Sequence, residues 1–140
     1  MTDEQVQEMN EFFSPRVPGI LGVETTDISP NQVVGKMDVS APLIAGTGYL
    51  FAPAVVALAD TLAAIGVGAS RPEGSQSFTT IELKANFLGS AREGDRVIGV
   101  ATAAHKGRST QVWDCTVTNE TTGRMIALFR CTQMILYPRS

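Results

Sequence analysis

The chain has 140 residues, of which 44% are hydrophobic and 18% charged, and its formal net charge is −3. This composition is typical of one globular domain and excludes a disordered chain. The negative charge disfavours a nucleic-acid partner, because such proteins usually carry a basic stripe, although a local basic pocket could still bind an anionic small molecule.

The cysteines and the single histidine exclude two further classes of site. Cys115 and Cys131 lie in apolar surroundings without CxxC spacing, which indicates reduced, packed thiols. His105 cannot complete a metal cluster alone, so we expect neither a metal nor another cofactor. The N-terminus is acidic and polar, which is not the pattern of a signal peptide. We therefore expect a cytoplasmic protein.

The N-terminal part predicts a helix followed by a hairpin. Apolar residues recur at near-helical spacing over residues 2–13, and prolines with a glycine break this helix over residues 14–19. Residues 20–28 are weakly strand-like, and residues 32–40 alternate as the second strand of a hairpin. We expect residues 1–18 to form an N-terminal helix and linker, and residues 19–140 to form a single domain.

A glycine-rich loop over residues 41–50 precedes a long apolar segment. Pro53 suits the first turn of a helix, which we expect to run to about Val67. Only Asp60 and Thr61 interrupt its apolar surface, and a helix that is apolar all round is buried. A membrane span is disfavoured, because a central aspartate is costly in a bilayer.

Four strand-like segments fill the C-terminal half of the chain. They are Gln76 to Leu88, Arg96 to His105, Ser109 to Glu120 and Arg124 to Leu136. Their connections are short and rich in turn residues, which forces antiparallel neighbours. The sequence therefore predicts an α+β domain with an antiparallel sheet curled around one buried helix.

Asp60 is the main candidate for chemistry. A carboxylate on a buried helix is either a paired structural acid or a functional group. The first turn of the same helix offers free backbone N–H groups and a positive dipole end, which could hold an oxyanion. Asp60 lies about 12 Å further along the helix axis, too far to serve the same acyl carbon. A second subunit could supply the missing proximity.

Three segments carry a family resemblance: APAVVALADTLA, TTIELKANFLGSAREGD and AHKGRSTQVWDCTVTNETTGRMIALFRCTQMIL. From about Gly19 to Leu136 the chain resembles the hotdog-fold acyl-CoA thioesterases of the PaaI-like, phenylacetate-degradation type. The resemblance implies a five- or six-stranded antiparallel sheet wrapped around a long helix. It also implies edge-to-edge dimers, often doubled to tetramers, with active sites at the dimer interface. The implied reaction is hydrolysis of an acyl-CoA or aroyl-CoA thioester.

The resemblance also assigns roles to residues. Asp60 takes the position of the nucleophile or general base, the Ala52 N–H that of the donor to the thioester carbonyl, and Thr80 that of a water-positioning hydroxyl. The residues expected at the acyl group are Gly48, Phe51, Thr61, Ala64 and Phe78. Those expected at coenzyme A are Arg92, Lys106, Gly107, Arg108 and Ser109.

This chain departs from the family pattern at the start of the helix. The family usually has His-Gly-Gly there, where this chain has Phe51-Ala52-Pro53, and Ala45 stands where an asparagine is expected. A backbone N–H donor survives these changes, but two polar groups are lost. The alternative is therefore a non-hydrolytic acyl-CoA binding protein on the same fold. A third reading is a structural dimer in which Asp60 is paired with an arginine.

Overall fold

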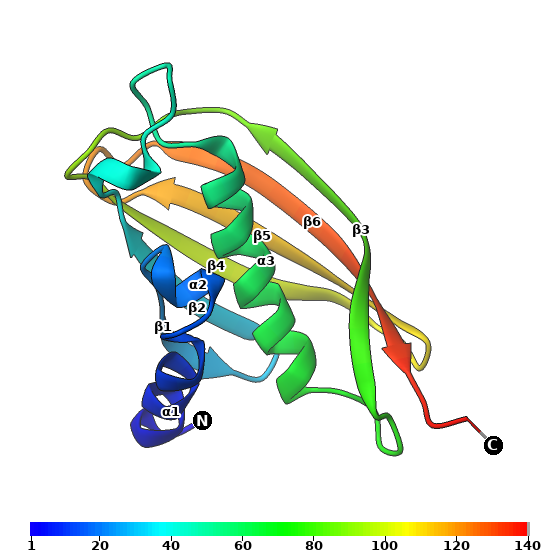
Figure 1. The fold of residues 1–140 in the computed structure, drawn as a ribbon. Helices are drawn as coiled ribbons and strands as arrows, with labels where there is room; N and C mark the ends of the chain where they lie inside the picture. The colour runs from blue at the N-terminus through cyan, green and yellow to red at the C-terminus, as the bar shows by residue number, and fades with distance from the viewer. Residues whose placement is uncertain (140) are drawn as a thin grey trace.

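The computed structural model describes residues 1–139, in which one long helix lies against a six-stranded antiparallel sheet (Figure 1). The strand order is β1-β2-β4-β5-β6-β3. The strands are β1 (Val23–Ser29), β2 (Gln32–Asp38), β3 (Ser77–Phe87), β4 (Arg96–Lys106), β5 (Thr110–Asn119) and β6 (Met125–Leu136). The helices are α1 (Asp3–Phe13), α2 (Val17–Ile20) and α3 (Ala52–Ala69), with a short 3₁₀ turn over Ala41–Leu43.

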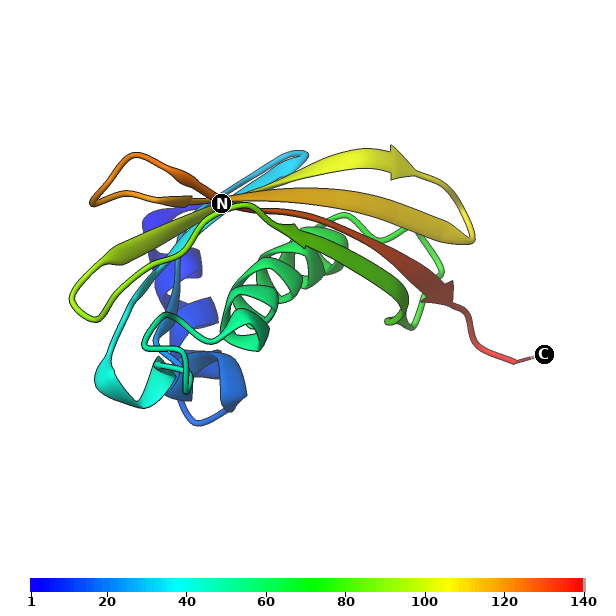
Figure 2. The same cartoon turned by 90° about the horizontal axis from the view of Figure 1, so that it is seen from above.

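The sheet arches over α3 and encloses it on one side (Figure 2). Burial alternates strictly along β5, where Gln111, Trp113, Cys115 and Val117 are buried toward α3 and the residues between them face outward. This alternation follows from the two-residue period of a strand. The predicted α+β architecture is therefore confirmed.

Helix α3 is the core helix of the fold. By length and apolar composition it could span a membrane, but more than half of it is buried inside the protein. Two close approaches fix its distance from the sheet. The Leu62 side chain fits over Gly35 and Gly99, where an added Cβ would lie 2.6 Å and 2.7 Å from its methyl groups. Gly66 lies directly on the Trp113 ring.

The two edge strands of the sheet differ. At the β1 edge, the Asn10 side chain on α1 donates to the Thr25 carbonyl at 2.8 Å and accepts from the Thr25 N–H at 2.7 Å. The free edge of β3 has no covering element among residues 1–139. Large apolar side chains on or next to it are exposed: Ile81 by 51%, Leu83 by 44%, Phe87 by 46% and Leu88 by 59%.

The expected pairing of β3 with β4 was wrong: the short connection between them does not form a hairpin, and β3 pairs with β6 at the edge of the sheet. Three local expectations were also wrong. Residues 17–20 form the short helix α2, because a proline at the start of a helix loses no hydrogen bond there. The first strand consequently begins at Val23 rather than at residue 20. Helix α3 continues to Ala69, two residues beyond the expected end.

Candidate functional site

Asp60 lies two turns into α3 and is partly buried. Its Oδ1 atom is inaccessible to solvent and has no hydrogen-bond partner within residues 1–139. Burial raises the pKa of the Asp60 carboxyl above its usual value, and hydrogen bonding from the Thr80 side chain opposes this rise. Such a carboxylate is more basic than a solvated one. No arginine is paired with it in the described part of the chain.

Asp60 belongs to an incompletely buried stripe of α3 that follows β3. Positions 52, 56, 60, 64 and 68 recur every four residues, so each lies about 40° further round the helix than the last, and the stripe winds gradually around α3. Along β3 this stripe meets Phe87 near Ala52, Thr80 near Asp60, and Phe78 near Gly68. The stripe thus borders the free edge of the sheet.

The predicted acyl-group residues lie along this same region but not all alike. Ala64 is partly buried on the stripe, one turn beyond Asp60, and Phe78 is partly buried beside the end of α3. Thr61 is buried, and its hydroxyl donates to the Ala57 carbonyl at 2.6 Å. Its proton is therefore engaged within its own helix. Phe51 is 51% exposed at the residue preceding α3.

The start of α3 offers a backbone donor. Ala52 is the first helical residue, so its N–H has no intrahelical partner. A small cavity of about 80 Å³ adjoins it, lined by Leu50, Val55, Phe87 and Ile126 among others. Gly48 lies in the preceding loop with φ 88°, a left-handed conformation that favours glycine. This loop is closed by hydrogen bonds between Ala45 and Tyr49 and between Leu50 and Ala91.

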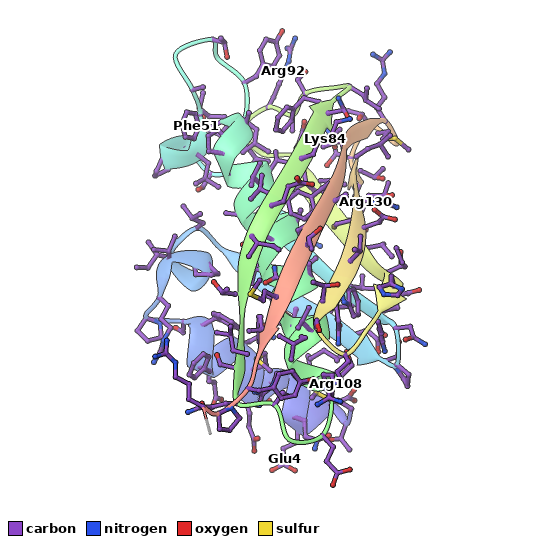
Figure 3. All side chains as sticks on the ribbon, turned by 90° about the vertical axis from the view of Figure 1, so that its right-hand side faces the viewer. Glu4, Phe51, Lys84, Arg92, Arg108 and Arg130 are labelled. Carbon is purple, nitrogen blue, oxygen red and sulfur yellow. The ribbon has the colours of Figure 1, made fainter. Side chains whose placement is uncertain are left out.

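One chain does not bring the predicted coenzyme A residues together. Arg92 lies at the same end of the molecule as Phe51, whereas Arg108 lies at the opposite end (Figure 3). Arg92 stacks over Tyr49, with 5.5 Å from its guanidinium carbon to the ring centre. Lys106 is the last residue of β4, and Gly107, Arg108 and Ser109 form the turn to β5. Within a single chain these residues form two separate basic ends.

A functional candidate that sequence analysis missed is Gln133. Its side chain is fully buried on the inner face of β6, and its Nε2 donates to the Thr80 Oγ1 at 2.7 Å. Its Oε1 has no partner among residues 1–139. The sequence signal for it is the alternation of β6, in which Gln133 falls in the same inward-facing series as Phe129, Cys131 and Ile135. A polar residue at a core-facing position requires a partner.

Within the 139 described residues, no three His, Cys, Asp or Glu side chains lie close enough together to hold a metal ion. The thiols of Cys115 and Cys131 are buried, and burial raises their pKa to about 12 and about 11. Protonated, enclosed thiols are poor nucleophiles. The chemistry available to the stripe is therefore that of a carboxylate, hydroxyls and backbone N–H groups.

Comparisons with known proteins agree with this fold. The model of the thioesterase superfamily matches residues 47–126. The 1,4-dihydroxy-2-naphthoyl-CoA hydrolase of Listeria monocytogenes is 33% identical over 112 residues, which cover 80% of this chain and 89% of that protein. The enzyme of the same name from Escherichia coli is 30% identical over 131 residues, 94% of each chain.

Two solved structures match the fold closely. A mutant thioesterase from Pseudomonas aeruginosa has a TM-score of 0.87 at 25% identity, over 94% of this chain and 93% of that one. The E. coli PaaI protein has a TM-score of 0.82 at 21% identity, over 95% and 92%, which supports the fold alone. The predicted resemblance is confirmed: this chain belongs to the thioesterase superfamily and has the hotdog fold.

Proposed function

We propose that this protein hydrolyses an acyl-CoA or aroyl-CoA thioester to the free acid and coenzyme A, with Asp60 as nucleophile or general base. The prediction that the chain is a thioester hydrolase is confirmed by its family and relatives. The observation that carries the role of Asp60 is its buried Oδ1 atom without a partner. An unpaired carboxylate oxygen is costly to bury and is typical of functional sites.

The proposed active unit is a dimer that pairs β3 with its copy. The free edge of β3 carries exposed apolar side chains, and unpaired strand edges readily pair with another chain. A two-fold axis through this edge runs the two β3 strands antiparallel. It also reverses the partner's α3, which moves the partner's Ala52 N–H toward the level of Asp60. This removes the separation of about 12 Å within one helix.

The same symmetry brings the two basic ends together. The Arg92 end of one chain lies near the Arg108 end of its partner when the β3 strands run antiparallel. Arginine and lysine are well suited to bind the phosphates of coenzyme A. The proposed coenzyme site is therefore made of Arg92 from one subunit and the turn over residues 106–109 from the other. A dimer of such dimers is compatible with this arrangement.

The proposed reaction uses the helix start and the carboxylate from different subunits. The Ala52 N–H and the helix dipole stabilise negative charge on the thioester oxygen. Asp60 either attacks the carbonyl carbon directly or removes a proton from a water that attacks it. In both routes a C–O bond forms, the C–S bond breaks, and the coenzyme leaves as a thiolate that takes up a proton. Water completes the direct route by hydrolysing the acyl-enzyme anhydride.

Aromatic acyl groups are the favoured substrates. Two relatives bear the name of an aroyl-CoA hydrolase, and Phe51 and Phe78 lie near the two ends of the stripe on α3. Apolar rings of this kind pack well on a flat acyl group. The Ala64 side chain, one turn from Asp60, leaves room for it.

The test of Asp60 is a substitution that keeps its shape. Asp60→Asn should reduce thiol release from a panel of short, long and aromatic acyl-CoAs by at least about 100-fold, the lower range for loss of a general base. The matched control is Asp114→Asn, which removes a carboxylate from the opposite face of the sheet. It should retain nearly full activity. Equal activity of Asp60→Asn and the native protein would refute the catalytic role.

The second candidate function is acyl-CoA binding without turnover. It is favoured by the residue preceding α3, where Phe51 offers no side-chain cap and replaces the histidine of the family pattern. This candidate predicts that acyl-CoA raises the melting temperature while free thiol stays at the background rate. Measurable turnover by the native protein, lost in Asp60→Asn, excludes it.

The proposed dimer has its own test. Leu83→Lys places a charge at the free edge of β3, on the face that it shares with Cys131, and the control Leu128→Lys places one on the outer face of β6 at a nearly equal exposure of 45%. Sedimentation should show that Leu83→Lys lowers the dimer fraction and that hydrolysis falls with it. A dimer unaffected by Leu83→Lys would argue against pairing through this edge.

A further inference from the structure

Gln133 is a buried polar residue that the proposed reaction does not yet use. Its exposure is 0%, and it lies between Cys131 and Ile135 on the inner side of β6. Burying an amide at an apolar position is costly unless the amide is hydrogen-bonded. Its Nε2 donates to the Thr80 Oγ1 at 2.7 Å, and more weakly to the Cys131 sulfur at 3.6 Å.

The direction of this hydrogen bond determines what Thr80 can do. A threonine hydroxyl has one proton to donate and can also accept. Because the Gln133 amide donates to the oxygen of Thr80, that oxygen already acts as an acceptor there. The hydroxyl proton is left to another acceptor. The neighbouring acceptor is the Asp60 carboxylate: burial raises its pKa, and the Thr80 side chain opposes part of this rise.

The register of the sheet holds this chain of three side chains in place. Thr80 and Gln133 are direct partners across β3 and β6. A bulge follows immediately in β3, between Thr80 and Glu82. Bulges redirect the side chains next to them. Thr80 therefore lies at the point where β3 changes its alternation, opposite a fully buried amide.

We propose that Gln133 is a positioning residue: it fixes the Thr80 hydroxyl as a hydrogen-bond donor to Asp60 and acts on hydrolysis only through Thr80. This inference rests on the proposed catalytic role of Asp60. It explains why a polar residue occupies a core position of β6. It also gives the exposed Thr80 side chain one defined orientation before substrate arrives.

Few other groups influence the protonation of Asp60. Asp60 is the only charged residue of α3. Of the strands packed on it, β6 contributes the Cys131 thiol, whose pKa Asp60 raises. The charged side chains of the neighbouring strands alternate onto the outer face of the sheet: Glu82 and Lys84 on β3, Asp114 on β5 and Arg130 on β6. Lys106 on β4 lies over the Trp113 ring and beside Gly66 in the last turns of α3. On β2, Lys36 is paired with Glu24 and Asp38 with Arg96 of β4.

The experiment compares Gln133→Met in three backgrounds: native, Thr80→Ser and Thr80→Val. Methionine has a similar volume and lacks the amide donor. The measurement is kcat/KM across acid and neutral pH, followed by loss of thioester absorbance with one aroyl-CoA. Gln133→Met should lower kcat/KM about tenfold on the acid side, the effect of losing one hydrogen bond to a charged group, with the loss diminishing as pH rises.

The backgrounds separate positioning from simple structural support. Thr80→Ser keeps a hydroxyl, so Gln133→Met should retain its effect there. Thr80→Val removes the hydroxyl, so the additional substitution should change the pH profile no further. A structural role would instead reduce activity by the same factor at every pH and in both backgrounds. That result would overturn the inference.

Failure of the proposed function and failure of the Gln133 inference give different results. If Asp60→Asn hydrolyses as fast as the native protein, the proposed function fails and the inference with it. If Asp60→Asn is inactive while Gln133→Met leaves the acid side of the profile unchanged, only the inference fails. Thermal melting of each variant, at equal protein concentration, identifies any that has simply unfolded.

Discussion

The contact between Gly66 and Trp113 provides the most direct test of how α3 is held on the sheet. Gly66→Ala adds one methyl group on the buried side of the last turn of α3. The new Cβ would lie 2.5 Å from Cζ3 and 2.8 Å from Cζ2 of the Trp113 ring, and closer still to Cη2. Real side chains do not approach this closely, so the ring or the helix must shift.

The expected magnitude follows from two opposing effects. Alanine is a better helix former than glycine by about 1 kcal/mol. Forcing an extra methyl group into a packed core costs about 1–3 kcal/mol. The ring has little freedom to move, because Trp113 is 1% exposed and its Nε1 donates to the Gln111 side chain at 2.9 Å. We therefore expect Gly66→Ala to lower the free energy of unfolding by about 1–2 kcal/mol.

The matched control lies two residues away in the same helix. An added Cβ at Gly68 would lie 3.7 Å from the Phe78 ring, which is ordinary contact. Gly68→Ala should leave stability unchanged or raise it by up to about 1 kcal/mol. Urea denaturation of both variants measures the difference. Equal or greater stability of Gly66→Ala than of the native protein would refute the packing argument.

Three further predictions concern buried polar groups and thiols. Burial raises the folded-state pKa of Asp60 above the usual 3.8, so ionising this carboxyl costs stability as pH rises through the folded-state value. Asp60→Asn should therefore be more stable than the native protein at neutral pH, and this advantage should vanish in acid. Urea denaturation at several pH values measures the difference in free energy of unfolding between the two proteins, and a difference that does not change with pH would contradict the prediction. Asn119→Ala removes a fully buried side chain that donates to Asp95 at 2.9 Å and accepts from two backbone N–H groups. In the same assay it should lower the free energy of unfolding by about 2–3 kcal/mol, and a loss below about 0.5 kcal/mol would refute the structural role of this side chain. Cys115 and Cys131 should not react with a thiol reagent at pH 8 until the protein is denatured, because their pKa values are about 12 and about 11, and rapid native-state labelling would contradict their burial.

Local pattern was sufficient to predict most of the elements. The alternation in β5 and the apolar run of α3 each come from one side of the interface between helix and sheet. Because each turn of the helix and each pair of strand residues contributes to that interface, the pattern recurs regularly along the sequence. Asp60 stood out for the same reason, since a lone charge interrupts an otherwise uniform pattern. Short connections also predicted the antiparallel neighbours β4, β5 and β6.

Long-range relationships were outside the reach of such patterns. That β3 pairs with β6 depends on how the sheet curls around α3, and no short segment encodes it. Gln133 was missed because a polar residue in an alternating strand ordinarily reads as solvent-facing, and its inward direction becomes evident only from the register. The separation of Arg92 from Arg108 likewise depends on which end of the sheet each turn occupies.

The position of β3 beside β6 also sets the order in which the protein can be completed during its synthesis. Strand β3 ends at Phe87, and its only neighbour within the described chain begins at Met125. The nascent chain therefore carries β3 unpaired, with its apolar side chains exposed, until β6 has emerged from the ribosome. Asp60 and Thr80 acquire Gln133 only when the last strand docks. Hydrolytic competence is thus expected to be among the last properties gained on folding, and the emerging β3 segment is the natural place for a chaperone to bind.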